Sequence, residues 1–298
     1  MLTSLDHIII GVHHLDAAAD TFAHKLGLLP SGGGVHPAGG TANRIIVIGD
    51  TYLELITVDR PEEAQESIRQ RLAKGEGYLN FVLSSNDLEA DCQAMRQRGV
   101  TVFGPKPGSL RSGDGRSRAW MRADIERLDL TQRYPFLIQH DSMGEERRRR
   151  LAGWSTPPEH PLGVFKVLSV TLAVEDLDEA SRRFSHIYGL QPSAPFSAAS
   201  QGMGARIVSF TLDQSGQAFE LATPALEDKG PNALRDYLDR FGESVYRVTL
   251  LVRDLAQARS YLDEREVAYT EVSGAQPLLW IDPAQSCGAS LVLQQTAA

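Results

Sequence analysis

Two kinds of segment alternate along this chain: short aliphatic runs, and stretches whose apolar residues have helical spacing. The first run, Ile8 to Val12, is rich in β-branched residues and is typical of a β-strand. Apolar residues then recur three to four positions apart between Ala17 and Ala23, which predicts a helix that ends at Gly27. A glycine-rich loop and two strands joined by a turn follow, over residues 31–40, 44–48 and 52–58.

The same order of elements returns later in the chain. Six of the ten residues from Phe22 to Ser31 are identical to those from Phe184 to Ser193. With a small insertion, the stretch from Tyr52 to Leu55 corresponds to the stretch from Ala218 to Leu221. Two weaker copies begin with the apolar runs at residues 78–83 and 246–252. We therefore expect four similar units arranged as two halves.

A charged segment that contains prolines separates the two halves. The charges run from Glu145 to Arg150, and Thr156-Pro157-Pro158 follows, which is typical of a linker. We predict a first domain over residues 1–144, a linker over 145–162 and a second domain over 163–298. The charged run itself is interpreted as a solvated face.

Composition and charge exclude several classes of function. The net charge of −8 and the pI of about 5.5 argue against nucleic-acid binding, because phosphate requires a basic face. No apolar run approaches the length of a membrane span, and the N-terminus lacks the features of a signal peptide. Cys92 and Cys287 have no metal-type spacing, so a reduced, cytoplasmic setting is expected.

Two polar side chains stand inside strand-like sequence. His7 begins the first apolar run, and Glu54 lies within the strand from Tyr52 to Val58. Burying such a group without a partner costs roughly 2–7 kcal/mol, and more for a charge. Either a divalent metal ion or a hydrogen bond is therefore expected to pair with each of them.

Four units that open with LDHIIIGV and close on an apolar-Glu-apolar strand resemble the vicinal oxygen chelate superfamily, which includes glyoxalases, bleomycin-resistance proteins and extradiol dioxygenases. The stretch from Gly34 to Asn43, followed by Tyr52 to Ile56, is similar to a bacterial glyoxalase-like subgroup. The resemblance implies an α+β fold in which four β-α-β-β-β units pair into two curled mixed sheets. It also implies a cleft that holds a divalent metal through residues on the first and last strand of each unit.

The repeat places eight residues of this chain at the ligand positions that the resemblance implies. On first strands they are His7, Asn80, Ser169 and Arg247, and on last strands Glu54, Gln139, Glu220 and Val292. His7, Glu54 and Gln139 form a mixed set that suits Zn, Mn, Fe, Ni or Co, while Asn80 departs from the family pattern. If the strand register slips by one residue, His140 replaces Gln139 and a His-His-carboxylate set results.

Further candidates for substrate binding lie around this set. His36 in the glycine-rich loop could contact substrate or transfer protons, or it could simply be exposed. Asn43 and Arg44 could hold a carboxylate or carbonyl at the cleft mouth, or could be turn and surface residues. Asn80 is a fourth candidate. In the second half, Glu220 faces Arg247, which we interpret as a salt bridge in place of a metal.

The resemblance implies a metal-dependent enzyme of the lyase, isomerase or dioxygenase type. It would act on a small oxygenated substrate, with Glu54 as a metal ligand or base. The alternative is a metal-free protein that sequesters a small molecule, as bleomycin-resistance proteins do. A third reading is a structural or regulatory dimer with no small ligand, which an exposed apolar patch at Trp120, Trp154 or Trp280 would favour. The second half is expected to support the fold or to form a homodimer.

Overall fold

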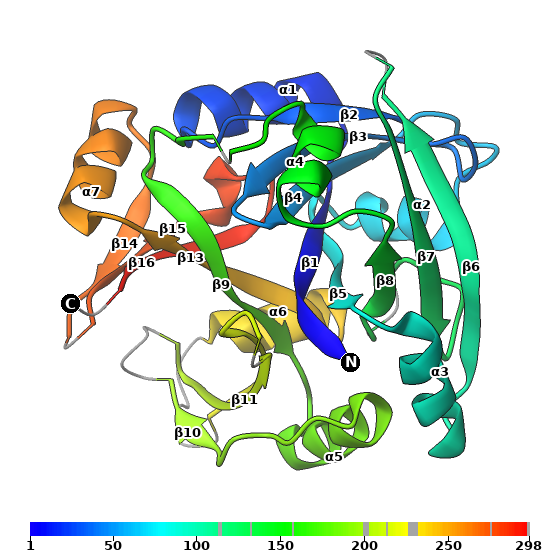
Figure 1. The fold of residues 1–298 in the computed structure, drawn as a ribbon. Helices are drawn as coiled ribbons and strands as arrows, with labels where there is room; N and C mark the ends of the chain where they lie inside the picture. The colour runs from blue at the N-terminus through cyan, green and yellow to red at the C-terminus, as the bar shows by residue number, and fades with distance from the viewer. Residues whose placement is uncertain are drawn as a thin grey trace.

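The computed structural model describes residues 1–112, 115–131, 133–156, 158–198, 203–212, 214–225, 232–274 and 276–296. These residues form two mixed sheets of eight strands each (Figure 1). The first sheet has the order β2-β3-β4-β1-β5-β8-β7-β6. Its strands are β1 (Leu2–Gly11), β2 (Ser31–Val35), β3 (Thr41–Ile48), β4 (Thr51–Val58), β5 (Gly77–Ser85), β6 (Val102–Arg111), β7 (Ser117–Ile125) and β8 (Phe136–His140).

The second sheet repeats this arrangement in the order β10-β11-β12-β9-β13-β16-β15-β14. Its strands are β9 (Val164–Ala173), β10 (Phe196–Ser197), β11 (Ala205–Leu212), β12 (Gln217–Pro224), β13 (Ser244–Val252), β14 (Tyr269–Val272), β15 (Leu278–Ile281) and β16 (Ser290–Gln295). In each half the opening strand pairs in parallel with the last strand of its own unit and antiparallel with the opening strand of the next. The expected α+β fold of four paired units is confirmed.

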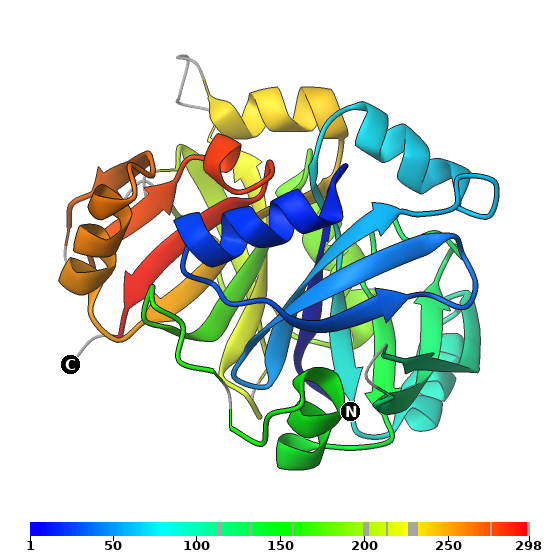
Figure 2. The same ribbon diagram turned by 90° about the horizontal axis from the view of Figure 1, so that it is seen from above.

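Helices connect the strands of each unit. They are α1 (Leu15–Asp20) with the π-helical turn Thr21–Lys25, α2 (Glu66–Ala73), α3 (Leu88–Gln97), α4 (Gly144–Ala152), α5 (Leu177–Tyr188), α6 (Ala233–Phe241) and α7 (Leu255–Glu264). Seen from above, α1, α2 and α6 lie along one side of the molecule (Figure 2). None of the described helices is long and apolar enough to cross a membrane.

One large core joins the two halves. It contains Ile8 and Ile10 of β1 together with Val170 and Leu172 of β9. The rings of Phe81 and Phe219, one from each half, lie 5.9 Å apart between centroids. The phenol of Tyr78 donates a 2.7 Å hydrogen bond to the carbonyl oxygen of Ser290. The halves are therefore packed against one another.

The alternation of side chains along β1 gives each face of the first sheet its own role. Ile8 and Ile10 point into the shared core, whereas Ile9 belongs to a separate cluster with Ile56 of β4 and Ile138 of β8. Because both faces of β1 are buried, the strand reads as a continuous apolar run without visible alternation. The face that carries Ile9 also carries His7, and this face bounds the site.

The predicted linker contains a helix that packs on the first half. In α4, Leu151 and Ala152 contact a cluster with Ile45, Val47 and Tyr52. The solvated-face interpretation is wrong for Arg147, which is buried, although Arg149 is exposed as expected. All strands of the first sheet lie within residues 2–140 and those of the second within 164–295. The predicted domain boundaries themselves stay a prediction.

Candidate functional site

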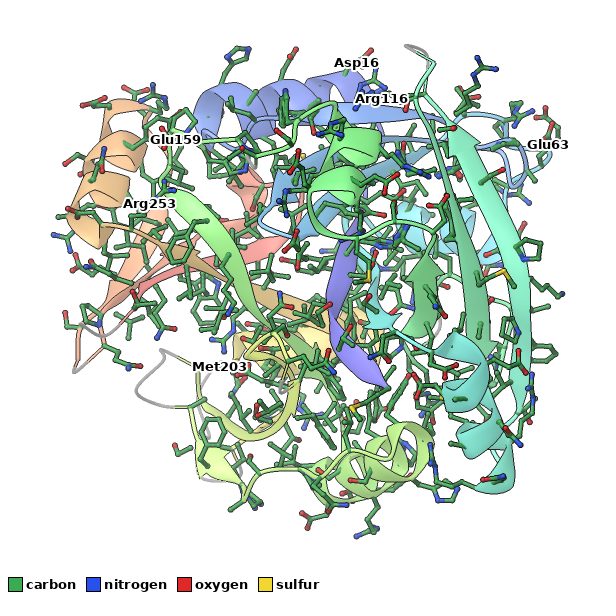
Figure 3. All side chains as sticks on the ribbon, in the orientation of Figure 1. Asp16, Glu63, Arg116, Glu159, Met203 and Arg253 are labelled. Carbon is green, nitrogen blue, oxygen red and sulfur yellow. The ribbon has the colours of Figure 1, made fainter. Side chains whose placement is uncertain are left out.

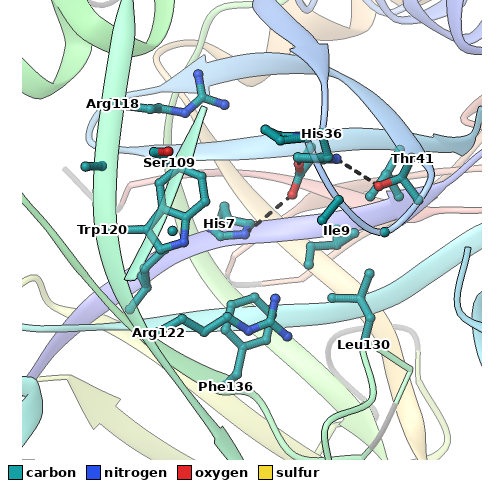
Figure 4. Close-up of a pocket in the computed structure, with 18 of the residues that line it drawn as sticks. His7, Ile9, His36, Thr41, Ser109, Arg118, Trp120, Arg122, Leu130 and Phe136 are labelled. Atoms are coloured by element: carbon teal, nitrogen blue, oxygen red, sulfur yellow. Dashed lines mark hydrogen bonds and ion pairs between the residues drawn. The ribbon is translucent and has the colours of Figure 1, made fainter. Parts of the chain in front are cut away.

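The first sheet bounds a cavity of about 770 Å³ (Figure 4). Glu54, His7 and His36 contribute polar groups to its wall, and Trp120 and Phe136 contribute aromatic rings. They come from β4, β1, the β2–β3 loop, β7 and β8, so five separate segments converge on one space. A concave apolar space with a few convergent polar groups is the usual form of a small-molecule site.

Glu54 lies at the centre of the polar groups. Its Oε2 is 3.5 Å from Nε2 of His7 and its Oε1 is 3.7 Å from Nε2 of His36. Asn43 donates a short hydrogen bond from Nδ2 to Oε1 of the same carboxylate, and its own Oδ1 accepts from the backbone amide of Gly34. The carboxylate is therefore held in one orientation by side chains from three segments.

The charges around Glu54 keep it ionised. Burial by itself would raise the pKa of this carboxyl group, but His7, His36 and the hydrogen bond from Asn43 outweigh burial, so the net shift of the pKa is downward. Arg118 on β7 contributes to the same lowering through its charge. At neutral pH Glu54 is a carboxylate that faces the cavity.

His7 is oriented by a second carboxylate behind it. Its Nδ1 lies 2.7 Å from Oδ1 of Asp6, and its ring stacks on Tyr52 with centroids 4.6 Å apart and planes at 7°. Asp6 is ionised and can only accept, so Nδ1 of His7 carries the proton and Nε2 faces Glu54. Asp6 reaches this position because β1 bulges there: Leu5 pairs with Leu83 and His7 already pairs with Val82.

Asp6 is itself the centre of a buried network. Nη2 of Arg147 lies 2.8 Å from its Oδ2, and Nε2 of His140 lies 3.3 Å from its Oδ1. Burial would raise the pKa of Asp6, but Arg147, His140 and His7 together hold it well below its usual range. Burial lowers the pKa of His140 in spite of the neighbouring Asp6. Helix α4 is therefore connected to the cavity through Arg147 and Asp6.

His36 lines the cavity. This position is the one expected if His36 contacts a substrate or transfers protons. Its Nδ1 lies 2.8 Å from Oγ1 of Thr41, which fixes the ring so that Nε2 faces Glu54 (Figure 4). The side chain is 21% exposed, so a ligand in the cavity could reach it.

Two of the predicted substrate-binding residues have other roles. Nη2 of Arg44 lies 3.0 Å from Oδ1 of Asp16. Figure 3 shows Asp16 at the edge of the molecule, on α1. Asn80 donates from Nδ2 to the carbonyl oxygens of Leu130 and Tyr134 and so anchors the loop between β7 and β8. Neither side chain lines the cavity wall described above.

Gln139 does not face the cavity. Its Oε1 accepts a hydrogen bond from the backbone amide of Leu88, and its Nε2 donates to the carbonyl oxygen of Asn86, at the start of α3. Its neighbours Ile138 and His140 line the cavity instead. The structure therefore has the alternative register, in which His140 takes the place that the resemblance gave to Gln139.

Asp6 and Arg118 were not candidates from the sequence, and Trp120 was considered only as part of an exposed apolar patch. Arg118, Trp120 and Arg122 alternate along β7 and all line the cavity, so a period-two pattern of large polar and aromatic residues could have identified this wall. Asp6 gave no such signal, because its inward position depends on the bulge.

The donor set does not fit the metal centre that the family positions imply. His7, Glu54 and His140, which takes the place of Gln139, line the cavity, whereas Asn80 and Gln139 bind backbone groups elsewhere. Nε2 of His140 lies 3.3 Å from Oδ1 of Asp6, so this imidazole is paired with Asp6 and does not join His7 and Glu54 in a ligand set. Within the part of the chain that the structure describes, no group of three or more His, Cys, Asp or Glu side chains is placed to hold a metal ion.

The equivalent place in the second half is filled by a salt bridge, as predicted. Nη2 of Arg247 lies 3.6 Å from Oε2 of Glu220, and Thr171 donates a 2.6 Å hydrogen bond to the same oxygen. Arg247 is 1% exposed, and burial lowers its pKa although Glu220 counteracts the shift. Ser169 and Val292 complete the four positions and cannot supply strong metal ligands.

Comparisons with known proteins identify the family. A family model described as "Glyoxalase-like domain" matches residues 5–188. A hypothetical protein from Staphylococcus aureus has 15% identity and a TM-score of 0.68, over 99% of this chain and 100% of its own. A mutant of 4-hydroxymandelate synthase from Streptomyces coelicolor has 13% identity and a TM-score of 0.69, over 99% and 92%.

At these identities the two solved structures show the fold alone, and no functionally curated protein matches the chain. The family expected from the repeated units is confirmed by the domain match. The protein belongs to the glyoxalase-like domain family of the vicinal oxygen chelate superfamily.

Proposed function

We propose that the first-half cavity is the active site of an enzyme that transfers a proton on a small oxygenated substrate. The observation that carries this proposal is the ionised carboxylate of Glu54, which lines the cavity between the imidazoles of His7 and His36. A carboxylate with imidazoles in reach is a common arrangement for general acid–base catalysis. We assign Glu54 the role of the base.

The lowered pKa of Glu54 has a consequence for the substrate. It keeps the carboxylate in its basic form but makes it a weaker base, so the proton that it removes must be acidified by the substrate or the site. A proton on the carbon beside a carbonyl group meets this need. When Glu54 takes that proton, the electron pair of the C–H bond forms a C=C bond, and the π pair of the carbonyl group moves to its oxygen, which becomes an oxyanion.

Positive charge is available for such an oxyanion. Arg118 lines the same cavity, and its charge is close enough to lower the pKa of Glu54. A fixed guanidinium in a site with little water stabilises developing negative charge without reorganisation. His36 can then return a proton to the same or another carbon, which completes an epimerisation or isomerisation.

The test is proton exchange with solvent. The protein is incubated in D2O with a panel of 2-oxo acids and 2-hydroxy ketones, and loss of the proton signal beside the carbonyl is followed by NMR. Glu54→Gln should slow the exchange at least about 100-fold, the lower end of the usual contribution of a general base.

Glu220→Gln is the matched control, because Glu220 is the repeat equivalent of Glu54 and pairs with Arg247 in the other half. It should leave the exchange rate unchanged. Equal exchange by the wild type and Glu54→Gln, or exchange with no compound of the panel, would refute the proposal.

The apolar wall of the cavity favours a second candidate function, the sequestration of a small hydrophobic molecule. Ile9, Ile56, Ile138, Trp120 and Phe136 all line the space and would bury a ligand without acting on it. This candidate predicts tight binding with no exchange, and binding that Glu54→Gln leaves unchanged.

A further inference from the structure

Arg118 is an unpaired buried cation in the cavity wall. The residue is 5% exposed, its Nη1 is buried, and that atom has no hydrogen-bond partner in the described structure. Glu54 affects it only as a charge, since no ion pair or hydrogen bond joins Arg118 to a carboxylate among the described residues. A buried guanidinium without a partner costs free energy, so its position implies a partner that arrives from outside.

The neighbouring cation on β7 is already committed. Arg122 donates from Nε to both carboxylate oxygens of Asp124, each 3.0 Å away, and its guanidinium stacks over the ring of Phe136 at 3.7 Å from the centroid. Arg122 therefore has both a carboxylate partner and an aromatic ring against its guanidinium. Arg118 differs from it in having donors left for a ligand.

The surface beside Arg118 is flat and apolar. Trp120 stands next to it on the same face of β7, and its indole packs directly against Gly108 of β6, where a Cβ would clash with the ring. Figure 4 shows the indole of Trp120 and the ring of Phe136 on the same side of the cavity, with Ile9 across from them. Such walls select a ligand with an extended apolar body.

We propose that the ligand of this cavity is a small aromatic or similarly flat carboxylate, with its carboxylate bound by Arg118 and its apolar body against Trp120 and Phe136. The inference rests on the proposed function, because it names the class of substrate for the same site. It gives Arg118 the carboxylate of the bound substrate as its first partner, and the same charge then stabilises the oxyanion that forms on a carbonyl next to that carboxylate. It accounts for the guanidinium, whose planar fork of donors matches the two oxygens of a carboxylate.

The charge around the cavity favours a carboxylate over a phosphate. Glu54 is ionised and belongs to the same wall, so a dianion would be repelled by it. Arg122 is neutralised by Asp124, which leaves Arg118 to balance the charge of the ligand. Because Arg118 supplies one positive charge and Glu54 already contributes one negative charge to the wall, a ligand with a single negative charge fits best.

The experiment measures binding by isothermal titration calorimetry with four probes: benzoate, benzamide, acetate and phenyl phosphate. Benzoate should bind at least about tenfold more tightly than benzamide, its neutral counterpart, as expected for a hydrogen bond to a charged group. The affinity of benzoate should also exceed that of acetate, which lacks the ring. Equal binding of benzoate and benzamide, or tighter binding of phenyl phosphate than of benzoate, would overturn the proposal.

Substitutions assign the preference to one side chain. Arg118→Gln should abolish the preference for benzoate over benzamide, and Arg118→Lys should retain part of it. Arg111→Gln removes the same charge from an exposed position on β6 and should retain the preference in full. A preference that survives Arg118→Gln would exclude Arg118 as the anchor.

The melting temperature of a variant shows whether a loss of binding comes from the loss of Arg118 itself or from a loss of folding. Since the guanidinium is buried without a partner, Arg118→Met should raise the melting temperature of the ligand-free protein. A lower melting temperature would show that Arg118 supports the fold and would overturn its role as an unsatisfied anion site.

The two proposals fail in different ways. If benzoate binds through Arg118 but no compound exchanges a proton, the catalytic proposal is wrong and the ligand class stands. If Glu54-dependent exchange occurs and carboxylates show no preference, the ligand class is wrong and the proposed chemistry stands.

Discussion

The substitution Arg147→Met tests whether the helix between the two halves supports the site. Arg147 extends from α4 to Asp6, with Nη2 and Oδ2 2.8 Å apart and side chains 11% and 1% exposed. It also donates to the backbone carbonyl of Asp50, and its guanidinium lies 5.7 Å from the centre of the Tyr52 ring. The substitution removes these contacts and leaves the carboxylate of Asp6 buried.

The expected loss of stability follows from that carboxylate. Removing one partner of a buried ion pair typically costs 3–5 kcal/mol, because the other charge stays in a site that cannot solvate it. Asp6 keeps His7 and His140 as donors, so the lower end of the range applies. We expect the free energy of unfolding to fall by about 3 kcal/mol at pH 7.

The same argument predicts how this loss depends on pH. The pKa of Asp6 in the folded protein is well below its usual value, so its ionisation stabilises the fold above the ordinary aspartate pKa of about 4 and less so as pH falls below it. Arg147 contributes strongly to that lowering. The difference between wild type and Arg147→Met should therefore persist from about pH 7 down to about pH 4 and shrink as the pH falls below about 4.

Urea unfolding of both proteins across this range measures the difference directly. Arg149→Met is the matched control, since Arg149 lies on the same helix and pairs with Glu145 through side chains that are 58% and 61% exposed. It should cost less than about 0.5 kcal/mol. An Arg147→Met loss that equals this control and does not change with pH would refute the buried network.

Two further predictions concern the cavity. Gln139→Ala should lower the free energy of unfolding by about 1 kcal/mol, because the hydrogen bond to Leu88 is lost, and should leave proton exchange unchanged. His140→Ala should slow the exchange, because His140 lines the cavity. If unfolding and NMR measurements show the reverse, the other register is correct. Elemental analysis of the purified protein should find far less than one metal ion per chain, with the same result for the His7→Ala, Glu54→Ala double variant. One bound metal per chain that the double variant loses would contradict this expectation.

The fold was largely readable from the sequence, and the reason is its internal repeat. The identities between Phe22–Ser31 and Phe184–Ser193 locate equivalent helix ends, and these fix the strands on either side. Local spacing located most strands and the helix that follows the first strand of each unit. It did not predict α2, α4 or α6, and β2 was expected as a loop. The burial of both faces of β1 could not be read from that spacing, because one face packs on the second half and the other on a cluster within the first half.

The site was less readable because it depends on register. In β8 the sequence Phe136 to His140 allows either Gln139 or His140 to face the cavity, and the pairing of His140 with Trp120 decides between them. Arg147 was hidden within a run of charges, yet it lies four residues before Leu151, on the face of α4 that packs inward. That spacing is the signal that could have revealed it.

The two halves show why the chemistry is proposed for one of them. Both keep a glutamate at the same place in the last strand, and each glutamate needs partners where it is buried. At the bulge of β9 the residue equivalent to Asp6 is Leu168, and Ser169 takes the place of His7. There the partner of Glu220 is Arg247, whose guanidinium is almost completely buried and stays charged at any physiological pH.

Around Glu54 the partners are the imidazoles of His7 and His36. The carboxylate is therefore paired with a guanidinium in one half and with imidazoles, the side chains that most often transfer protons in enzymes, in the other. Replacing His7 by serine, the residue at the equivalent position of the second half, tests this difference. A His7→Ser variant should retain the fold and, because Asp6 then has no ring to orient towards Glu54, lose the proton exchange that Glu54 supports.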